Sequence, residues 1–136
     1  MAIYQTHFAF DLAADAGEAE RFNRAIDEAG AAGVSTSDDG DQLDGIGCRF
    51  DTATGSLAIF DCDGSPNLWA LAKALQRLLP ARLPIGFAYS CSCDMPRSDG
   101  FGGGFFAIGA ETIVHRDLGA LLGEAIAELG EACHAR

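Results

Sequence analysis

Lysine is nearly absent from this sequence: Lys73 is the only one, beside eight arginines and against 20 aspartates and glutamates. The formal net charge at pH 7 is therefore -11. Proteins bind DNA and RNA mainly by neutralising phosphates with Lys and Arg side chains. The arginines are spread from Arg21 to Arg136 without a cluster, so we expect no direct nucleic-acid binding. A large acid excess is typical of a protein whose net charge keeps it in solution.

Long apolar runs are missing as well. No stretch approaches the roughly 18 consecutive apolar residues of a membrane-spanning helix, so we expect no membrane insertion. The N-terminus lacks the basic start and apolar stretch of a signal peptide, which predicts a cytoplasmic protein. Five cysteines, an odd number, are consistent with a reducing compartment. We interpret Cys48, Cys62 and Cys133 as small buried hydrophobic residues.

The remaining composition is that of an ordinary globular protein, with 49% apolar and 21% charged residues in a chain of 136. Linkers, repeats and low-complexity runs are not found, so residues 1–136 are expected to form a single domain. A domain of this size buries roughly 65–70% of the surface of its unfolded chain, so its core needs neither a metal nor a disulfide.

Period-two alternation and helix-capping patterns predict the secondary structure. Asp15 and Glu18 form a capping-box pattern at the start of the first helix, and Gly30 ends it. Ser65 is the predicted N-cap of the second helix, with Pro66 at its first position. The other predicted elements are strands over 3–12, 45–51, 56–62, 84–93 and 104–114, the end of the second helix at Pro80, and a last helix capped by Asp117.

This order, β-α-β-β-α-β-β-α, predicts a mainly antiparallel α+β fold. Its first six elements match the ferredoxin-like βαββαβ sandwich, here extended by a C-terminal β-hairpin strand and a helix. Right-handed crossovers place the first two helices on the same face of the sheet. Residues 57–60 and 105–108 are apolar on both faces of their strands, so the second face also needs a cover. The last helix or a second copy of the chain would supply it, and we expect a homodimer.

The loop between the last two predicted strands is the main candidate for a ligand site. It contains Arg97, a donor for carboxylate or phosphate, and the consecutive glycines Gly102, Gly103 and Gly104, whose amides would form an anion-binding nest. The run is neither G-x-G-x-x-G nor a P-loop, and it precedes a strand, so no helix dipole assists an anion. The other residues predicted to line this site are Phe101, Tyr89 and His7.

Cys91 and Cys93 are two residues apart and therefore share one face of their strand. Together with His7 or His115 they would make a metal site, but zinc sites usually contain C-x-x-C pairs, and no second close pair is present. Two core-facing strand cysteines are the more ordinary interpretation. The sequence also contains no cofactor motif, and we expect no cofactor.

Two functions follow from these patterns. The first is a non-enzymatic protein-interaction or regulatory module, favoured by the acidity, by the apolar sheet faces and by the lack of a catalytic motif. The alternative is a protein that binds a small molecule or anion, or an enzyme, with its site at the glycine-rich loop 94–104. A protein partner is expected in the first case and a concave pocket beside the loop in the second.

Overall fold

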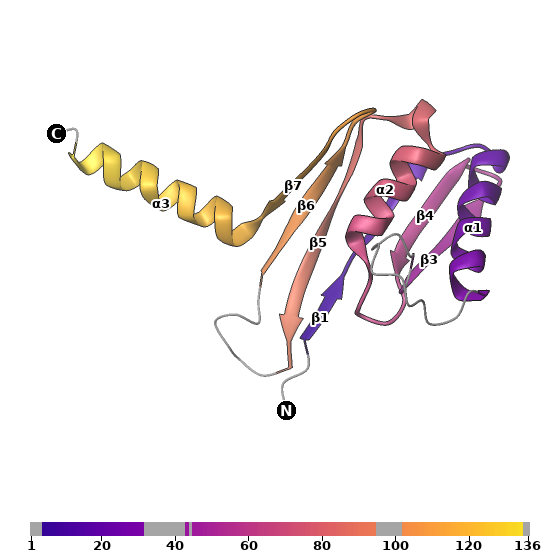
Figure 1. The fold of residues 1–136 in the computed structure, drawn as a ribbon, viewed down its shortest axis with the longest axis horizontal. Coiled ribbons are helices and arrows are strands. Elements are labelled where there is room, and N and C mark those ends of the chain that lie inside the picture. Colours follow the sequence, from indigo (N-terminus) through magenta and orange to yellow (C-terminus); the bar gives the residue numbers. More distant parts are fainter. Residues whose placement is uncertain (1–3, 32–42, 44, 95–101, 135–136) are drawn as a thin grey trace.

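The computed structural model of the chain describes residues 4–31, 43, 45–94 and 102–134, and Figure 1 shows their arrangement. In these residues the fold is a mixed α+β fold with antiparallel sheets and three α-helices. The elements are β1 (Tyr4–His7), β2 (Ala9–Ala13), α1 (Ala16–Ala31), β3 (Ile46–Asp51), β4 (Ser56–Asp61), α2 (Leu68–Leu78), a 3₁₀ turn η1 (Pro80–Arg82), β5 (Ile85–Cys93), β6 (Gly102–Ile108), β7 (Ile113–Asp117) and α3 (Leu118–His134).

The first predicted strand is divided in two at Phe8. β1 pairs with β5 in a sheet of order β1-β5-β6-β7, whereas β2 pairs with β4 in a sheet of order β2-β4-β3. Asp61 stabilises the change of partner, because its Oδ1 accepts a hydrogen bond from the Phe8 amide at 2.9 Å. Its own amide donates to the Phe8 carbonyl at 3.2 Å. The Phe8 ring is 5% exposed and lies in the core.

The predicted capping box of α1 is confirmed. The Glu18 amide donates to Asp15 Oδ1 at 2.7 Å, and the Asp15 amide donates to Glu18 Oε1 at 3.0 Å. The predicted N-cap of α2 was wrong: the cap is Asn67, whose Oδ1 accepts from the Ala70 amide at 3.1 Å. Ser65 belongs instead to a turn in which its amide donates to Asp63 Oδ1 at 2.9 Å. The helix therefore begins two residues later than the Ser-Pro pattern indicates.

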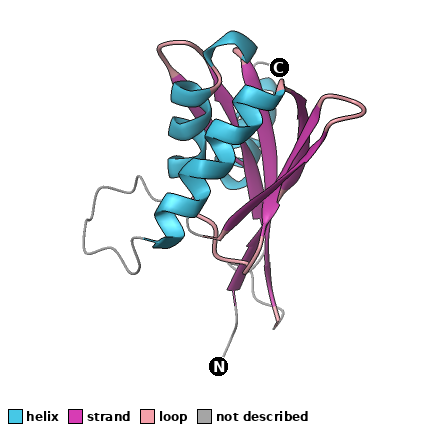
Figure 2. Cartoon of the chain, turned by 90° about the vertical axis from the view of Figure 1, so that its right-hand side faces the viewer, coloured by secondary structure: helices cyan, strands magenta, loops and turns pink. Residues whose placement is uncertain are grey.

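The core lies between the strands and the two helices α1 and α2. Figure 2 shows both helices on the same side of the strands, as the crossover rule predicts. The largest fully buried side chains come from α1, from α2 and its C-cap, and from the strands: Phe22, Leu57, Ile59, Leu71, Leu75, Leu79 and Ile108. Burying side chains of this kind contributes about 1.5–3 kcal/mol each.

The predicted strand 104–114 is instead a hairpin of β6 and β7. The Gly109 amide donates to the Thr112 carbonyl at 2.8 Å and closes the turn. β6 also begins two residues earlier than predicted, so Gly102 to Gly104 belong to the strand and pair with β5. Their placement in the preceding loop was therefore wrong, because the ladder takes up backbone groups that a nest needs free.

Helix α3 begins where β7 ends and extends away from the sheets (Figure 1). The predicted cap is confirmed, since Asp117 Oδ1 accepts from the Ala120 amide at 2.7 Å. This helix, one of the two covers expected for the second sheet face, does not cover that face in its own chain. Four of its apolar side chains are 53–69% exposed, namely Leu118, Leu122, Ile126 and Leu129, which we call the α3 stripe. Among the described residues, no helix is long and apolar enough to cross a membrane.

Candidate functional site

A groove of about 500 Å³ between the start of α2 and the sheet is lined by polar and aromatic side chains. We call it the aromatic groove. It is lined by Thr6 of β1, by residues 65–69 at the start of α2, by Tyr89 of β5, by Phe106 of β6 and by His115 of β7. Four strands and the start of one helix, which are far apart in the sequence, therefore contribute to one surface.

Strand register explains how these side chains meet. Tyr89 is opposite Gly104, and Phe106 is opposite both Phe87 on one side and His115 on the other. Gly104 has no side chain, so the Tyr89 ring can cross β6 and reach β7. A Cβ at position 104 would lie 2.8 Å from the Tyr89 hydroxyl oxygen. The glycine-rich segment thus makes room for an aromatic contact.

Tyr89 and His115 are joined by a hydrogen bond of 2.6 Å between the phenol oxygen and Nε2. Burial raises the pKa of Tyr89, and the nearby Cys91 and Asp117 raise it further. The phenol therefore stays protonated at neutral pH and donates to Nε2 when that nitrogen carries no proton. This bond holds both rings in fixed positions at the floor of the groove.

The rings form a continuous stack. Phe106 stacks on His115 with centroids 4.5 Å apart and on Phe87 at 5.2 Å. Trp69 meets Phe106 edge-on at 5.0 Å and His115 at 5.7 Å, and 46% of Trp69 is exposed. An indole exposed beside a fixed ring stack can receive another flat apolar group, since aromatic pairs add about 0.5–1.5 kcal/mol beyond area burial.

The predicted site residues are only partly brought together. Tyr89 lines the aromatic groove, and the glycines of β6 lie next to it in the sheet. His7 is adjacent to Thr6 in β1 and therefore points to the opposite face. Arg97 and Phe101 lie outside the described residues.

His7 takes part in a separate contact. Its Nδ1 is 2.9 Å from Asp61 Oδ2, and its Nε2 is 3.2 Å from Gln5 Oε1. Burial opposes ionisation of Asp61, but the hydrogen bonds from His7 and from the Phe8 amide outweigh it and lower the pKa of Asp61. His7 and Ser90 are register partners. The histidine is therefore part of the contact that stabilises the division between β1 and β2.

The described cysteines do not gather into a cluster. Cys91 Sγ is 3.7 Å from Thr6 Oγ1, and Cys93 Sγ is 3.8 Å from Asp94 Oδ1. No group of three or more His, Cys, Asp or Glu within the described part of the chain is arranged to hold a metal ion. Cys62 is exposed, so its interpretation as a buried hydrophobic residue was wrong. The side chain of Cys133 lies outside the described set.

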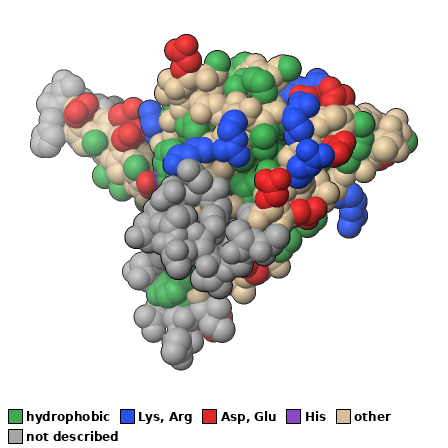
Figure 3. All heavy atoms as spheres, turned by 45° about the vertical axis from the view of Figure 1, so that its right-hand side comes forward, with side chains coloured by type: hydrophobic (Ala, Val, Ile, Leu, Met, Phe, Trp, Pro, Cys, Tyr) green, Lys and Arg blue, Asp and Glu red, His purple; other side chains and the backbone are tan. Residues whose placement is uncertain are grey.

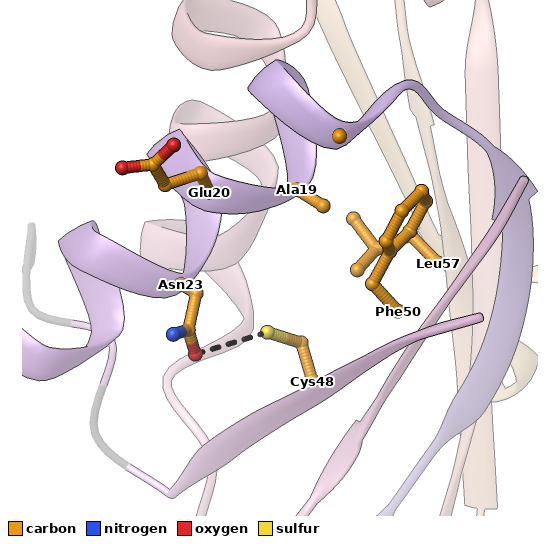
Figure 4. Close-up of a pocket in the computed structure, with 7 residues that line it drawn as sticks. Ala19, Glu20, Asn23, Cys48, Phe50 and Leu57 are labelled. Carbon is orange, nitrogen blue, oxygen red and sulfur yellow. Dashed lines mark hydrogen bonds between the residues drawn. The ribbon is translucent and has the colours of Figure 1, made fainter. Parts of the chain in front are cut away.

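A second cavity of about 320 Å³ lies between α1 and β3 (Figure 4). Figure 4 shows Cys48 and Phe50 of β3 pointing toward Ala19 and Asn23 of α1, and the Cys48 thiol is 3.6 Å from Asn23 Oδ1. Burial raises the pKa of Cys48, and Asp27 raises it further. A protonated thiol is a poor nucleophile, and Ala16, Glu20 and Leu57 complete the lining of this cavity under α1.

The most exposed apolar surface lies on α3. At about 100° per residue, the α3 stripe occupies one arc of the helix. Figure 3 shows hydrophobic and acidic side chains next to each other on this projecting helix. The acidic arc lies on the other side and consists of Glu124, Glu128 and Glu131. The helix is thus amphipathic, although neither of its arcs faces the core.

The sheet face opposite α1 and α2 is also uncovered by any described helix (Figure 2). Its side chains are mostly small. We define this open sheet face by the exposed residues Ala9, Ala88, Phe105 and Ala107 together with the half-buried Ala58 and Phe60. Arg49 of β3 and Arg116 of β7 are exposed on the same face, as is Asp11 of β2.

Sequence reasoning missed Trp69 and the pairing of Tyr89 with His115. The signal for Trp69 was its position one residue after the first apolar residue of α2, as the single tryptophan of the chain. The partners of Tyr89 depend on strand register, which no local pattern indicates. Comparison of the chain with protein-family models, curated proteins and solved structures gives no match in any of the three.

Proposed function

We propose that this chain is a non-enzymatic protein-interaction module that binds another polypeptide through α3. One observation carries the proposal, namely that the α3 stripe is more than half exposed along a 17-residue helix. Monomeric soluble proteins rarely expose such a contiguous apolar surface, and larger exposed patches mark interaction sites.

The composition of α3 supports the same conclusion. Isolated helices of about 12–15 residues are marginal in water, and most helical stability in proteins comes from packing an apolar face. Gly119, Gly123 and Gly130 lie inside the helix. Each costs about 1 kcal/mol relative to alanine. A helix with these costs gains its stability when the stripe is buried against a partner.

The aromatic groove also favours binding over catalysis. Its phenol and imidazole are hydrogen-bonded to each other within a ring stack, and the raised pKa of Tyr89 opposes ionisation of the phenol at neutral pH. Cys91, which shares this face of β5, contacts the Thr6 hydroxyl rather than a base. These contacts fix shape more than they prepare a nucleophile.

The test is native mass spectrometry of the untagged protein isolated from its own cells, compared with two variants made there. Leu122→Glu adds a charge to the apolar arc, whereas Ala120→Glu adds the same charge on the acidic side of α3. We expect a stoichiometric complex, with itself or with another protein, that Leu122→Glu loses and Ala120→Glu keeps. A bare monomer mass for the wild-type chain would refute the interaction function.

A specific observation favours a second candidate, a small-molecule site in the aromatic groove. Trp69 is exposed beside the fixed Tyr89–His115 pair, and ligand sites combine apolar walls with a few polar groups in this way. Because Trp69 is the single tryptophan, its fluorescence reports on the groove alone. Titration with benzamide and 4-hydroxybenzoate should change Trp69 emission saturably, and unchanged emission in the millimolar range would remove this candidate.

We further infer a ferredoxin-like arrangement extended by β6, β7 and α3. It is supported by the strand partners of the N-terminal segment, which pairs with β5 through β1 and with β4 through β2. The succession would then be β3-β4-β2/β1-β5, with α1 and α2 on one face. Cross-strand nuclear Overhauser contacts on both sides of residues 4–13 would test it. A single domain over residues 1–136 predicts one cooperative unfolding transition, and the cytoplasmic location stays a prediction.

A further inference from the structure

We infer that the partner of α3 is a second copy of this chain, with each α3 lying on the open sheet face of the other protomer. The inference rests on the proposed interaction function and names its partner. It joins two apolar surfaces of the same chain that one copy leaves uncovered, the α3 stripe and the open sheet face.

The connection between β7 and α3 keeps the two surfaces of one chain apart. β7 ends at Asp117 and α3 begins at Leu118, so no loop residue separates them. Asp117 is held on both sides, because it is the register partner of Gly104 in β6 and its side chain caps the Ala120 amide. The helix therefore cannot turn back over its own sheet while β7 stays paired with β6. Exchange between two copies removes this constraint.

The open sheet face has the shape that receives a helix. Ala9, Ala88 and Ala107 present single methyl groups, so a helix can approach the backbone of the sheet closely. Phe105, which is 37% exposed, supplies a large apolar side chain among them. The α3 stripe presents longer Leu and Ile side chains, and large side chains on one surface pack well over small ones on the other.

Charge favours the same pairing. When the α3 stripe faces a sheet, Glu124 and Glu128 lie at one margin of the contact and in solvent. Two basic side chains, Arg49 and Arg116, and one acidic side chain, Asp11, are exposed on the open sheet face. Attraction between these glutamates and the exposed arginines of the other protomer would orient the helix on the sheet. The same glutamates would repel negatively charged surfaces.

The area estimated for this exchange lies at the lower limit for a specific interface. A helix of 17 residues is about 25 Å long, and a face about 10 Å wide then covers roughly 250 Å². Two such helices on two sheet faces remove roughly 1,000 Å² from water in total, which is about the minimum expected of a specific interface. When the same two protomers exchange helices with each other, both surfaces of each chain are occupied and the assembly closes as a two-fold dimer, whereas donation of the helix to a third copy would form an open chain.

The test is sedimentation velocity of the purified full chain over a concentration series, with three variants. We expect the wild type and Ala120→Glu to form dimers at micromolar concentration. Leu122→Glu, on the stripe, and Ala88→Lys, on the open sheet face, should each weaken the dimer by about 100-fold or more, because the change occurs at both contacts. Both sites are exposed in one protomer, and circular dichroism should show each variant folded.

Mixing the two disruptive variants tests reciprocity. An equimolar mixture of Leu122→Glu and Ala88→Lys contains mixed dimers in which one contact is intact and the other carries both changes. It should associate more tightly than either variant alone. Pairing of α3 with α3 would leave Ala88→Lys fully dimeric, and that result would overturn the inference.

A wild-type chain that stays monomeric at tens of micromolar would also overturn it. The interaction function itself would survive that result if the native complex with a different protein were still lost in Leu122→Glu and kept in Ala120→Glu. The two proposals therefore fail in distinguishable ways.

Discussion

The carboxylate of Glu18 provides the sharpest test of how this fold is stabilised. It is 4% exposed and is the one buried charged side chain among the described residues. Arg82 donates to it from Nε at 3.0 and 3.2 Å and from Nη2 at 2.8 Å, and the Asp15 amide donates at 3.0 Å. The Arg82 contact therefore fastens the start of α1 to η1, 64 residues away in the sequence.

Glu18→Ala removes the ion pair and half of the capping box. Removing one partner of a buried pair costs about 3–5 kcal/mol, but 35% of the Arg82 side chain is exposed, so water solvates part of the orphaned guanidinium. The lost cap contributes about 1 kcal/mol. We therefore expect the free energy of unfolding to fall by about 2–3 kcal/mol, as measured by urea denaturation at equal protein concentrations.

Glu20→Ala is the matched control, because the Glu20–Arg24 ion pair of 2.9 Å lies on the exposed side of the same helix. Such exposed pairs contribute about 0–0.5 kcal/mol. If Glu18→Ala and Glu20→Ala lowered the midpoint equally, the role assigned to the buried carboxylate would be refuted.

The same carboxylate predicts a pH dependence with a definite sign. Hydrogen bonding to Arg82 is the main cause of the lowered pKa of Glu18, and burial only partly opposes it. A lowered folded-state pKa gives stability that is fully present above the unfolded value of about 4.3 and is lost as the pH falls through the folded value. The urea concentration at the midpoint of unfolding should therefore decrease as the pH is lowered below about 4, and this decrease should be smaller in Glu18→Gln.

Two other pairs of substitutions test local structure. Gly104→Ala should destabilise the protein by about 1–3 kcal/mol, because its Cβ would meet the backbone carbonyl oxygen of Arg116 in β7 and, at 2.8 Å, the Tyr89 hydroxyl. Gly102→Ala, whose Cβ meets nothing within 4 Å, should change the urea midpoint little, and equal losses would contradict the close packing of β7 and Tyr89 around Gly104. Asn67→Ala should cost about 1 kcal/mol and Ser65→Ala almost nothing. The reverse order in thermal or urea unfolding would show that the helix is capped at the serine after all.

The predicted ligand site differs from the observed groove more than the predicted fold differs from the observed fold. The sequence pointed to the loop 94–104 as a ligand site because its glycines and Arg97 are chemically distinctive. The glycines of β6 instead lie in a strand and leave space for the Tyr89 ring. Of the residues predicted for the loop site, Tyr89 lines the aromatic groove, whereas α2 and β7 contribute Trp69 and His115.

The sequence alone determined the features that depend on contacts between residues close together in the chain. The capping box of Asp15 and Glu18 and the cap at Asp117 each close within three residues, so they form with few demands on the rest of the chain. The hairpin of β3 and β4 follows from alternation on both sides of a four-residue turn. Local hydrogen bonds of this kind are visible in a linear pattern.

Only the tertiary structure decided the features that join distant segments. Asp61 divides the first strand at Phe8 across 53 residues, and the Tyr89–His115 bond spans 26. The pairing of β7 with β6 sets the direction of α3. The apolar side chains of this helix, which the sequence pattern predicts to be buried, are therefore exposed. Strand register and side-chain packing determine such contacts. Many arrangements satisfy the same local preferences, and complementarity between distant segments selects one of them.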